Sequence, residues 1–582
     1  MTSLSRGSES TLTANIEKLP ANICAPVANS RPGSRNSHMS NKMNQENTMK
    51  KSGDETYVHV FLTGPKLYMA LSGAALACFL VLLDVSIIAT VIPQITTDFQ
   101  SLPDIRWYGS AYQLTSSAFQ PFSGQIYAHF STKWSFLTFF FLFELGSLLC
   151  GAAQGSVMLI VGRAVAGIGS SGLINEGLTI VSACLPVQKQ PAATGILISF
   201  CQLGIALGPI LGGAFTEHVS WRWCFYINLP VGAVVGGFIG LIGIPEATRK
   251  LPVREVLRNA VSSLDLIGLG IFVPAAVMFF LALSWGGNDY TWSSAIIIGL
   301  FCGSFVAIII FPIWEYRKGD AAMVPFSILR MRIMWSSSAT MFFFQGVLLC
   351  GNFYLPIYFQ TVRGKSPITS GVNMLPIVMF QVFMAVVSGV SVQKFGYYLP
   401  FVVGGTSITA NGYGLYSMLE PSSTMGQWVG FEVIFGIGSG CAGAMAFIAL
   451  QSAIPAAQIS VAMGTLLFIQ NLGGAIWLTI PQIIFSSSLR STIPRYAPDV
   501  DAQTVIAAGA NAVRAVVNAN DLPGVLKSYN VSINRVMYMG AGISSAAFLR
   551  GWWMGWSDVR PKKTETEGDQ RHKIEKNDVV PV

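Results

Sequence analysis

The chain has 582 residues, of which 52% are hydrophobic and only 11% are charged. This composition excludes an array of soluble domains and is typical of a protein with many membrane-spanning helices. The formal net charge of +8 does not indicate a nucleic-acid partner, because the basic residues concentrate in short loops between apolar segments. The nine cysteines include no CxxC pair and the five histidines show no ligand spacing, so we predict no metal and no other cofactor.

The first 65 residues are rich in Ser, Asn, Thr and Lys and have no apolar core near Met1. They predict a disordered tail and not a cleavable signal peptide. Fourteen apolar segments long enough to span a bilayer follow. They lie near residues 67–92, 107–129, 134–153, 157–181, 192–215, 222–244, 264–284, 294–314, 335–357, 368–391, 398–418, 427–450, 460–484 and 533–556.

The short loops between these segments differ in charge. If both termini are cytoplasmic, most loop Lys and Arg residues fall on the inner side, and the outer short loops carry only Arg106, Arg363 and Lys365, with Arg222 at a boundary. This asymmetry predicts cytoplasmic termini.

The segment 485–532 is then the only long outer loop. Within residues 501–517, Val505, Ala512, Val513, Val516 and Val517 recur at helical spacing, which predicts an amphipathic helix on the membrane surface. A glycosylation sequon begins at Asn530, close to the last span, so we expect low occupancy.

The two halves of the chain repeat. GIGS at 167–170 recurs at 436–439, and Gln202-Leu203-Gly204 recurs as Asn471-Leu472-Gly473. Both matches have an offset of 269 residues, which predicts two six-helix halves separated by an extra helix pair.

The fifth span contains GIALGPILGG from Gly204 to Gly213. Gly204, Gly208 and Gly212 recur every fourth residue, so they line one helix face and let another backbone approach closely. Pro209 bends the helix within that face. Ordinary helix packing explains a single GxxxG equally well, but the longer pattern resembles the antiporter motif of proton-driven exporters in the major facilitator superfamily.

Three further motifs carry the same resemblance: LDVSIIATVIP (Leu83 to Pro93), LIVGRAVAGIGSSG (Leu159 to Gly172) and WRWCFYINLPVG (Trp221 to Gly232). They are similar to motifs of the fourteen-helix drug:proton antiporters, in particular the fungal toxin and multidrug efflux pumps. The resemblance implies an all-α polytopic membrane protein with the major facilitator fold and a 6 + 2 + 6 helix arrangement. The expected parts are a tail (1–65), an N-terminal bundle (66–245), the extra pair (246–333), a C-terminal bundle (334–556) and a cytoplasmic tail (557–582).

The inner loop after the second span departs from the family pattern GxLxDRxGRR. This chain reads GQIYAHFSTK from Gly124 to Lys133, with Ala128 in place of the gating aspartate and His129 among the replaced residues. Gly124, His129 and Lys133 are nevertheless the candidates for an inner gate. The sequence does not decide how the missing acid affects gating.

Charged residues inside spans are costly and need a reason. Asp84 and Arg163 lie at similar depth from the outer side, and Glu144 reaches the same level, so these three are the candidates for proton coupling. Each is alternatively a structural residue, and for Glu432, the repeat counterpart of Arg163, the structural role leads. Candidates for the cavity lining are Gln113, Gln202, Gln345, Gln470 and Glu432.

The function that the resemblance implies is proton-coupled efflux of a small, rather apolar organic molecule by alternating access, without enzymatic activity. The partners would be the substrate, protons and the lipid bilayer, with no nucleic acid, and the protein would be monomeric in the plasma membrane or the vacuolar membrane. Two alternatives remain: a proton-coupled importer of a siderophore or basic amino acid, and a membrane sensor that transports nothing. The sequence leaves open the substrate and the proton stoichiometry.

Overall fold

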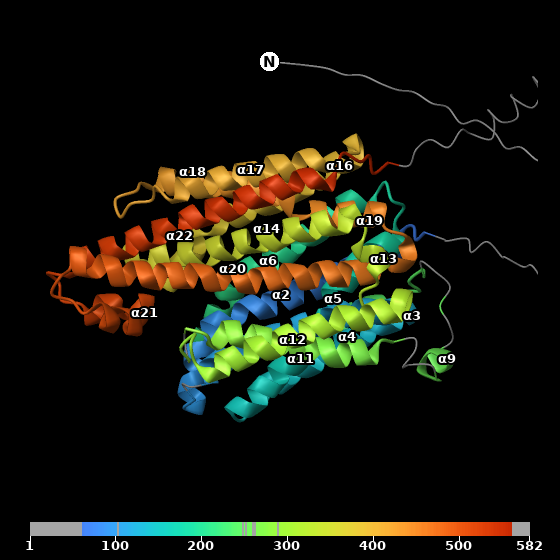
Figure 1. Cartoon of the computed structure of the whole chain (residues 1–582), viewed down its shortest axis with the longest axis horizontal. Coiled ribbons are helices and arrows are strands. Elements are labelled where there is room, and N and C mark those ends of the chain that lie inside the picture. Colours follow the sequence, from blue (N-terminus) through green and yellow to red (C-terminus); the bar gives the residue numbers. More distant parts are fainter. Residues whose placement is uncertain are drawn as a thin grey trace, which may run out of the picture. The chain divides into compact units, whose positions relative to one another are not determined.

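The structure is a computed structural model that describes residues 61–101, 104–246, 250, 253–258, 264–287 and 290–560. The predicted tails lie almost entirely outside these ranges. The described residues are almost all helical, and the only β-structure among them is two isolated bridges. Figure 1 shows the helices in chain order, and we keep its labels.

The N-terminal half contains α2 (Pro65–Phe99), α3 (Ile105–His129), α4 (Thr132–Gly151), α5 (Ser156–Cys184), α6 (Gln190–His218), α7 (Trp223–Tyr226) and α8 (Asn228–Leu241). The middle segment contains α9 (Val253–Arg258), α11 (Leu266–Trp285), α12 (Ala295–Lys318) and α13 (Phe326–Leu329). The C-terminal half contains α14 (Arg332–Ile357), the π-helical η3 (Tyr358–Val362), α15 (Pro367–Asn373), α16 (Leu375–Phe395), α17 (Leu399–Tyr416), α18 (Met425–Gly443), α19 (Met445–Ala453), α20 (Ile459–Tyr496), α21 (Ala502–Val516) and α22 (Leu522–Gly551).

Each of the fourteen predicted spans coincides with a helix or with two consecutive helices. Within the described ranges, eleven helical segments are long and apolar enough to cross a membrane by length and composition. The exceptions are α3, α17 and α22. α3 and α22 carry polar residues along much of their length, and the 18 residues of α17 include Thr406, Ser407, Thr409 and Asn411, which lower its mean hydropathy.

The helix starts repeat with the offset found in the sequence. α5 begins at residue 156 and α18 at 425, and α6 begins at 190 and α20 at 459. The packing also repeats, since α2 contacts α6 as α14 contacts α20, and α4 contacts α5 as α17 contacts α18. The two halves therefore have the same internal arrangement, although their exact domain boundaries remain a prediction.

Two helix crossings join the halves near the end predicted to be cytoplasmic, which we call the inner end. Where α3 crosses α20, a Cβ on Gly124 would lie 2.5 Å from the Ser460 carbonyl oxygen, and one on Gly464 would lie 2.7 Å from that of Gln120. Where α6 crosses α16, the same close approach involves Gly195 and the Ala385 carbonyl, at 2.6 Å. Side chains larger than hydrogen do not fit at these positions, so glycine permits the closure.

The predicted outer loop 485–532 needs correction. α20 continues to Tyr496 and α22 begins at Leu522, so both ends of this segment, 485–496 and 522–532, extend the spans beyond the apolar run (Figure 1). The amphipathic helix exists as α21, but Val505 and Val513 on its apolar face are buried against the protein. Arg514 donates to the carbonyls of Thr361 and Val362 in η3, at 3.0 Å each. The side chain of Ala512 lies outside the described part.

Candidate functional site

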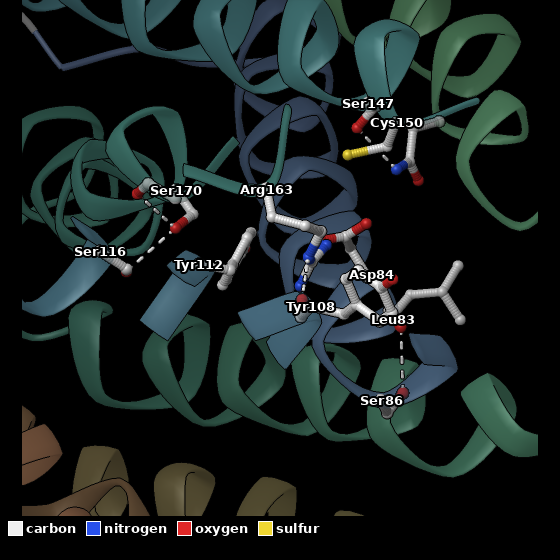
Figure 2. Close-up of polar contacts among 12 residues, drawn as sticks. Leu83, Asp84, Ser86, Tyr108, Tyr112, Ser116, Ser147, Cys150, Arg163 and Ser170 are labelled. Atoms are coloured by element: carbon white, nitrogen blue, oxygen red, sulfur yellow. Dashed lines mark hydrogen bonds and ion pairs between the residues drawn. The ribbon is translucent and has the colours of Figure 1, made fainter. Parts of the chain in front are cut away.

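Asp84 on α2 and Arg163 on α5 form an ion pair inside the N-terminal half (Figure 2). Arg163 Nη1 lies 2.5 Å from Asp84 Oδ2, and both residues are 1% exposed. α2 and α5 also pack closely nearer the inner end, where a Cβ on Gly177 would lie 2.6 Å from Cys78 Sγ. The sequence placed Asp84 and Arg163 at similar depth, and the tertiary structure brings their side chains into contact.

α3 completes the surroundings of the Arg163 guanidinium. Arg163 Nε donates to the Tyr108 carbonyl at 2.9 Å, and the guanidinium carbon of Arg163 lies 4.3 Å from the centre of the Tyr112 ring (Figure 2). Asp84 Oδ1, in contrast, has no hydrogen-bond partner among the described residues. Removing one member of a buried pair typically costs about 3–5 kcal/mol, because the other charge is left uncompensated. The pair is thus tightly held between α2, α5 and α3.

Glu144, the third candidate for proton coupling, lies on α4 where this helix meets α8. A Cβ on Gly232 of α8 would collide with the Glu144 carboxylate. Both carboxylate oxygens lack a hydrogen-bond partner among the residues that the structure describes. Glu144 therefore stays in the same half as Asp84 and Arg163 but does not complete their ion pair.

The glycines of the α6 motif pack against α2. A Cβ on Gly204 would lie 2.6 Å from the Phe79 carbonyl, and one on Gly208 or Gly212 would collide with the hydroxyls of Ser86 or Thr90. Ser86 Oγ donates to the Gly204 carbonyl at 3.1 Å, which ties the two backbones together. This contact lies on the same helix as Asp84, so a displacement of α6 acts directly on the helix that carries the ion pair.

Two members of the motif differ from the rest. A Cβ on Gly213 would meet nothing within 4 Å, so Gly213 does not belong to the packed face. The reason is that residue 213 points about 100° away from residue 212 on a helix, so the predicted face of Gly204, Gly208 and Gly212 does not include it. Pro209 lies inside α6 as predicted, and the helix continues through it.

The candidates for the cavity lining do not gather at one place. Gln113 lines a cavity that is described below, and Gln345 Oε1 accepts from Gln470 Nε2 at 2.7 Å, so that these two join α14 to α20. Gln202 is half-buried on α6. Glu432 on α18 is fully buried, and both of its carboxylate oxygens lack a partner among the described residues.

Among the described residues, Gly124 is the one inner-gate candidate for which a contact with the other half is seen. Gly124 meets Ser460, whereas His129 Nδ1 lies 3.0 Å from the Gln125 carbonyl of its own helix and Lys133 Nζ donates to the Gly240 carbonyl at 2.5 Å. The gating role of His129 and Lys133 stays a prediction. Both side chains reach carbonyls within the N-terminal half.

The position of the missing acid is occupied by a different contact. Lys250 Nζ donates to the carbonyls of Tyr127 and Ala128 at 2.8 Å each, at the C-terminal end of α3. A cation at a helix C-terminus is favourable. Burial lowers the pKa of Lys250, although the carboxylates of Glu246 and Glu176 act in the opposite direction. The linker after α8 thus caps α3 where the family pattern has its aspartate.

The sequon residue Asn530 lies inside α22 and not in a loop. It is buried, and its Nδ2 donates to the Leu419 carbonyl at 3.0 Å. In this fold the side chain is not accessible to a glycan.

A cavity of about 1060 Å³ lies near the opposite, outer ends of α3 and α20. Its lining comes from these two helices, from α11 and the segment after it, and from Phe353 on α14. Gln113 on α3 and Gln482 on α20 face it from the two halves. The halves thus meet at the inner end and leave room for a small molecule at the outer end.

The sequence comparisons agree with this architecture. The profile of the Major Facilitator Superfamily matches residues 74–478, which is well over half of the chain. This chain belongs to the major facilitator superfamily.

Relatives within the superfamily cover most of the chain. The MFS-type transporter pigP of Monascus ruber is 47% identical over 88% of this chain and 90% of its own length. The efflux pump mlcE of Penicillium citrinum is 45% identical over 86% of this chain and 92% of its own length. Among solved structures, the proton:xylose symporter XylE aligns with a TM-score of 0.56 at 14% identity, over 85% of this chain and 97% of its own, and supports the fold alone.

The sequence analysis did not predict several residues that join helices in this protein. Asn471 Nδ2 donates to Gln120 Oε1 at 2.6 Å between the halves, and Gln451 accepts from Thr194 at 2.9 Å and donates to the Leu178 carbonyl at 3.1 Å. Asn471 was visible as the repeat counterpart of Gln202. Gln451 carried no comparable signal, because a lone glutamine in an apolar helix does not show which neighbour it faces.

Proposed function

We propose that this chain exports small, largely apolar organic molecules across the membrane in exchange for protons. Relatives that cover most of the chain bear the names of efflux pumps and transporters of the major facilitator superfamily. Export by a membrane-embedded transporter is the function that they support. Proton exchange is the additional step, and the Asp84–Arg163 pair is the single observation that carries it.

A buried ion pair favours the ionised carboxylate as long as its partner stays close. Arg163 is held on α5 and contacts α3, whereas Asp84 belongs to α2, which is packed against α6. A shift of α2 with α6 relative to α5 would lengthen the contact and favour protonation of Asp84. The opposite shift would release the proton. If the arrangement with the lengthened contact binds the proton and the arrangement with the closed contact binds the substrate, or the reverse, the protein exchanges one for the other.

The available energy is sufficient for export against a gradient. One proton entering down about 100 mV contributes about 2.3 kcal/mol. One pH unit adds about 1.4 kcal/mol. Together they sustain a concentration ratio on the order of 500-fold for one proton per substrate.

We further propose that the protein acts as a monomer in the plasma membrane.

Transport into inside-out membrane vesicles tests this function. The vesicles contain the full chain, their lumen is acidified, and an organic extract from the organism that encodes the chain serves as the source of substrates. Mass spectrometry should detect compounds that accumulate only with the chain present and only while the pH gradient lasts. Accumulation in right-side-out vesicles with an acidic exterior would instead identify an importer. No accumulation in either orientation would contradict transport.

A further inference from the structure

The outer cavity is built by three parts of the chain and not by the two halves alone. α3 contributes Arg106, Ser110 and Gln113, and α20 contributes Thr479, Gln482 and Arg490. The third wall is the end of α11 with the segment that connects it to α12. The volume of the whole cavity, about 1060 Å³, is at the upper end of the range for small-molecule sites. The extra helix pair therefore forms one wall of this cavity in addition to separating the halves.

The wall contributed by the extra pair is aromatic and held in place. Phe280, Tyr290 and Trp292 line the cavity. The Trp292 ring stacks on that of Phe301 with centroids 6.5 Å apart. A Cβ on Gly287, whose φ is +73°, would lie 2.6 Å from Trp292 Nε1. Because only glycine adopts this conformation readily and leaves room for the indole, the turn positions Trp292.

The charged residues that line the cavity in the described part of the chain all have the same sign. Arg106 lies at the outer start of α3 and Arg490 near the outer end of α20, and both side chains are exposed. The lining residues that the structure describes include no Asp or Glu. Residues 288 and 289 of the connecting segment lie outside the described part. Guanidinium groups bind carboxylates and similar anions through charge-assisted hydrogen bonds. The chemistry of this rim therefore suits an anionic group next to an apolar body.

The inner end of the extra pair is anchored to α3. The Asp265 amide donates to Gln125 Oε1 at 3.0 Å, and Gln125 Nε2 donates to the Ala321 carbonyl at 3.2 Å. Asp265 is fully buried and also accepts from Trp314 Nε1 at 2.8 Å, which joins α11 to α12. The aromatic wall is thus connected to the N-terminal half, whereas Arg490 belongs to the C-terminal half. Rocking of the halves would separate these two parts of the cavity.

We propose that this cavity binds amphipathic organic anions, with an apolar body against the aromatic wall and an acidic group at the Arg106 and Arg490 rim. This proposal rests on the proposed export function and assigns its substrate class. It also gives the extra helix pair a role: the pair supplies one wall of an outward-facing site that is dismantled when the halves rock.

A matched set of probes tests the charge preference. Naphthylacetate, naphthylacetamide and naphthylethylammonium share one apolar body and differ in charge. Their binding to the full chain in lipid nanodiscs is measured by equilibrium dialysis, with empty nanodiscs subtracted. Naphthylacetate should bind tightest. Arg490→Gln should weaken its binding about 5–10-fold and leave the amide unchanged, and Arg490→Lys should restore most of the loss.

Two further variants serve as controls. Arg495→Gln removes a charge from the same helix at a residue that does not line the cavity, and it should leave all three affinities unchanged. Phe353→Ala removes an exposed apolar part of the lining and should weaken all three probes alike. Equal binding of the three probes, or an Arg490→Gln protein with unchanged naphthylacetate affinity, would overturn the proposal. Loss of pH-driven export in the vesicle assay with the anion preference retained would instead count against the proposed function alone.

Discussion

Arg163 and Glu432 occupy equivalent positions in the two halves, 269 residues apart, on helices whose starts have the same offset. Arg163 is paired with Asp84 and bonded to the Tyr108 carbonyl, whereas the Glu432 carboxylate has no hydrogen-bond partner among the described residues. The repeat has therefore kept a buried ionisable residue at one position while reversing its charge. Among the described residues, the N-terminal copy has an ionic partner and the C-terminal copy has none, so we expect the halves to have different roles.

Glu432→Gln should have little effect on proton-driven export. Glutamine keeps the shape and removes only the ionisable group, and no described partner depends on that group. We expect initial rates of pH-driven accumulation in inside-out vesicles within about twofold of the wild type. A loss of pH-driven accumulation as large as the one expected below for Asp84→Asn would show that the C-terminal half also carries a coupling proton.

Asp84→Asn should abolish pH-driven accumulation and retain downhill exchange of substrate. Asparagine keeps the size of the side chain but cannot exchange a proton, so coupling is lost even where the fold survives. Counterflow in preloaded vesicles measures the exchange. Asp98→Asn is the matched control on the same helix, because Asp98 accepts from Trp221 near the outer end. If Asp84→Asn still accumulates substrate against a gradient, the coupling role is excluded.

Gly208→Val should inactivate transport, and Gly213→Val should not. The added side chain at 208 collides with Ser86 and separates α6 from α2, whereas residue 213 has open space. Overpacking of this kind typically costs about 1–3 kcal/mol. Export rates are compared after surface expression of both variants has been quantified. Equal activity of the two variants would mean that the contact between α2 and α6 has no part in transport.

Gln451→Leu should loosen the inner closure. The substitution removes the bond to the Leu178 carbonyl and leaves the Thr194 hydroxyl without its acceptor at the contact between the halves, at a cost of about 1–3 kcal/mol. The inner-open state should then gain about 5–150-fold in population. Cys201 belongs to the buried cluster at this end, so its alkylation by a water-soluble maleimide, followed by peptide mapping, reports the opening.

Ser452→Ala is the control for this measurement. Its hydroxyl donates to the Ala449 carbonyl within the same helix, at 2.9 Å, and does not join the halves. Cys201 should label at the wild-type rate in this variant. An unchanged rate in Gln451→Leu as well would show that the glycine crossings hold the inner end closed without Gln451.

The sequence by itself determined the helical class, the positions of the spans and the repeat. These follow from apolar length, because a helix that crosses a bilayer must satisfy its backbone internally and needs about 20 apolar residues. The motif on α6 also predicted which glycines face another helix, since spacing by four places residues on one face. Gly213 completes the motif in letters but was not predicted on that face, and a Cβ there would meet nothing within 4 Å.

Only the tertiary structure decided which polar groups meet. A helix in a membrane is apolar on all sides, so its sequence does not reveal which face turns toward which neighbour. Rotation of α2 and α5 brought Asp84 to Arg163, and the packing of α11 against α3 placed an aromatic wall opposite Arg490. Backbone carbonyls, such as that of Tyr108, are the same at every residue and leave no mark in the sequence. The spans can therefore be predicted from the apolar composition of the chain, whereas the site depends on how each helix is rotated about its axis.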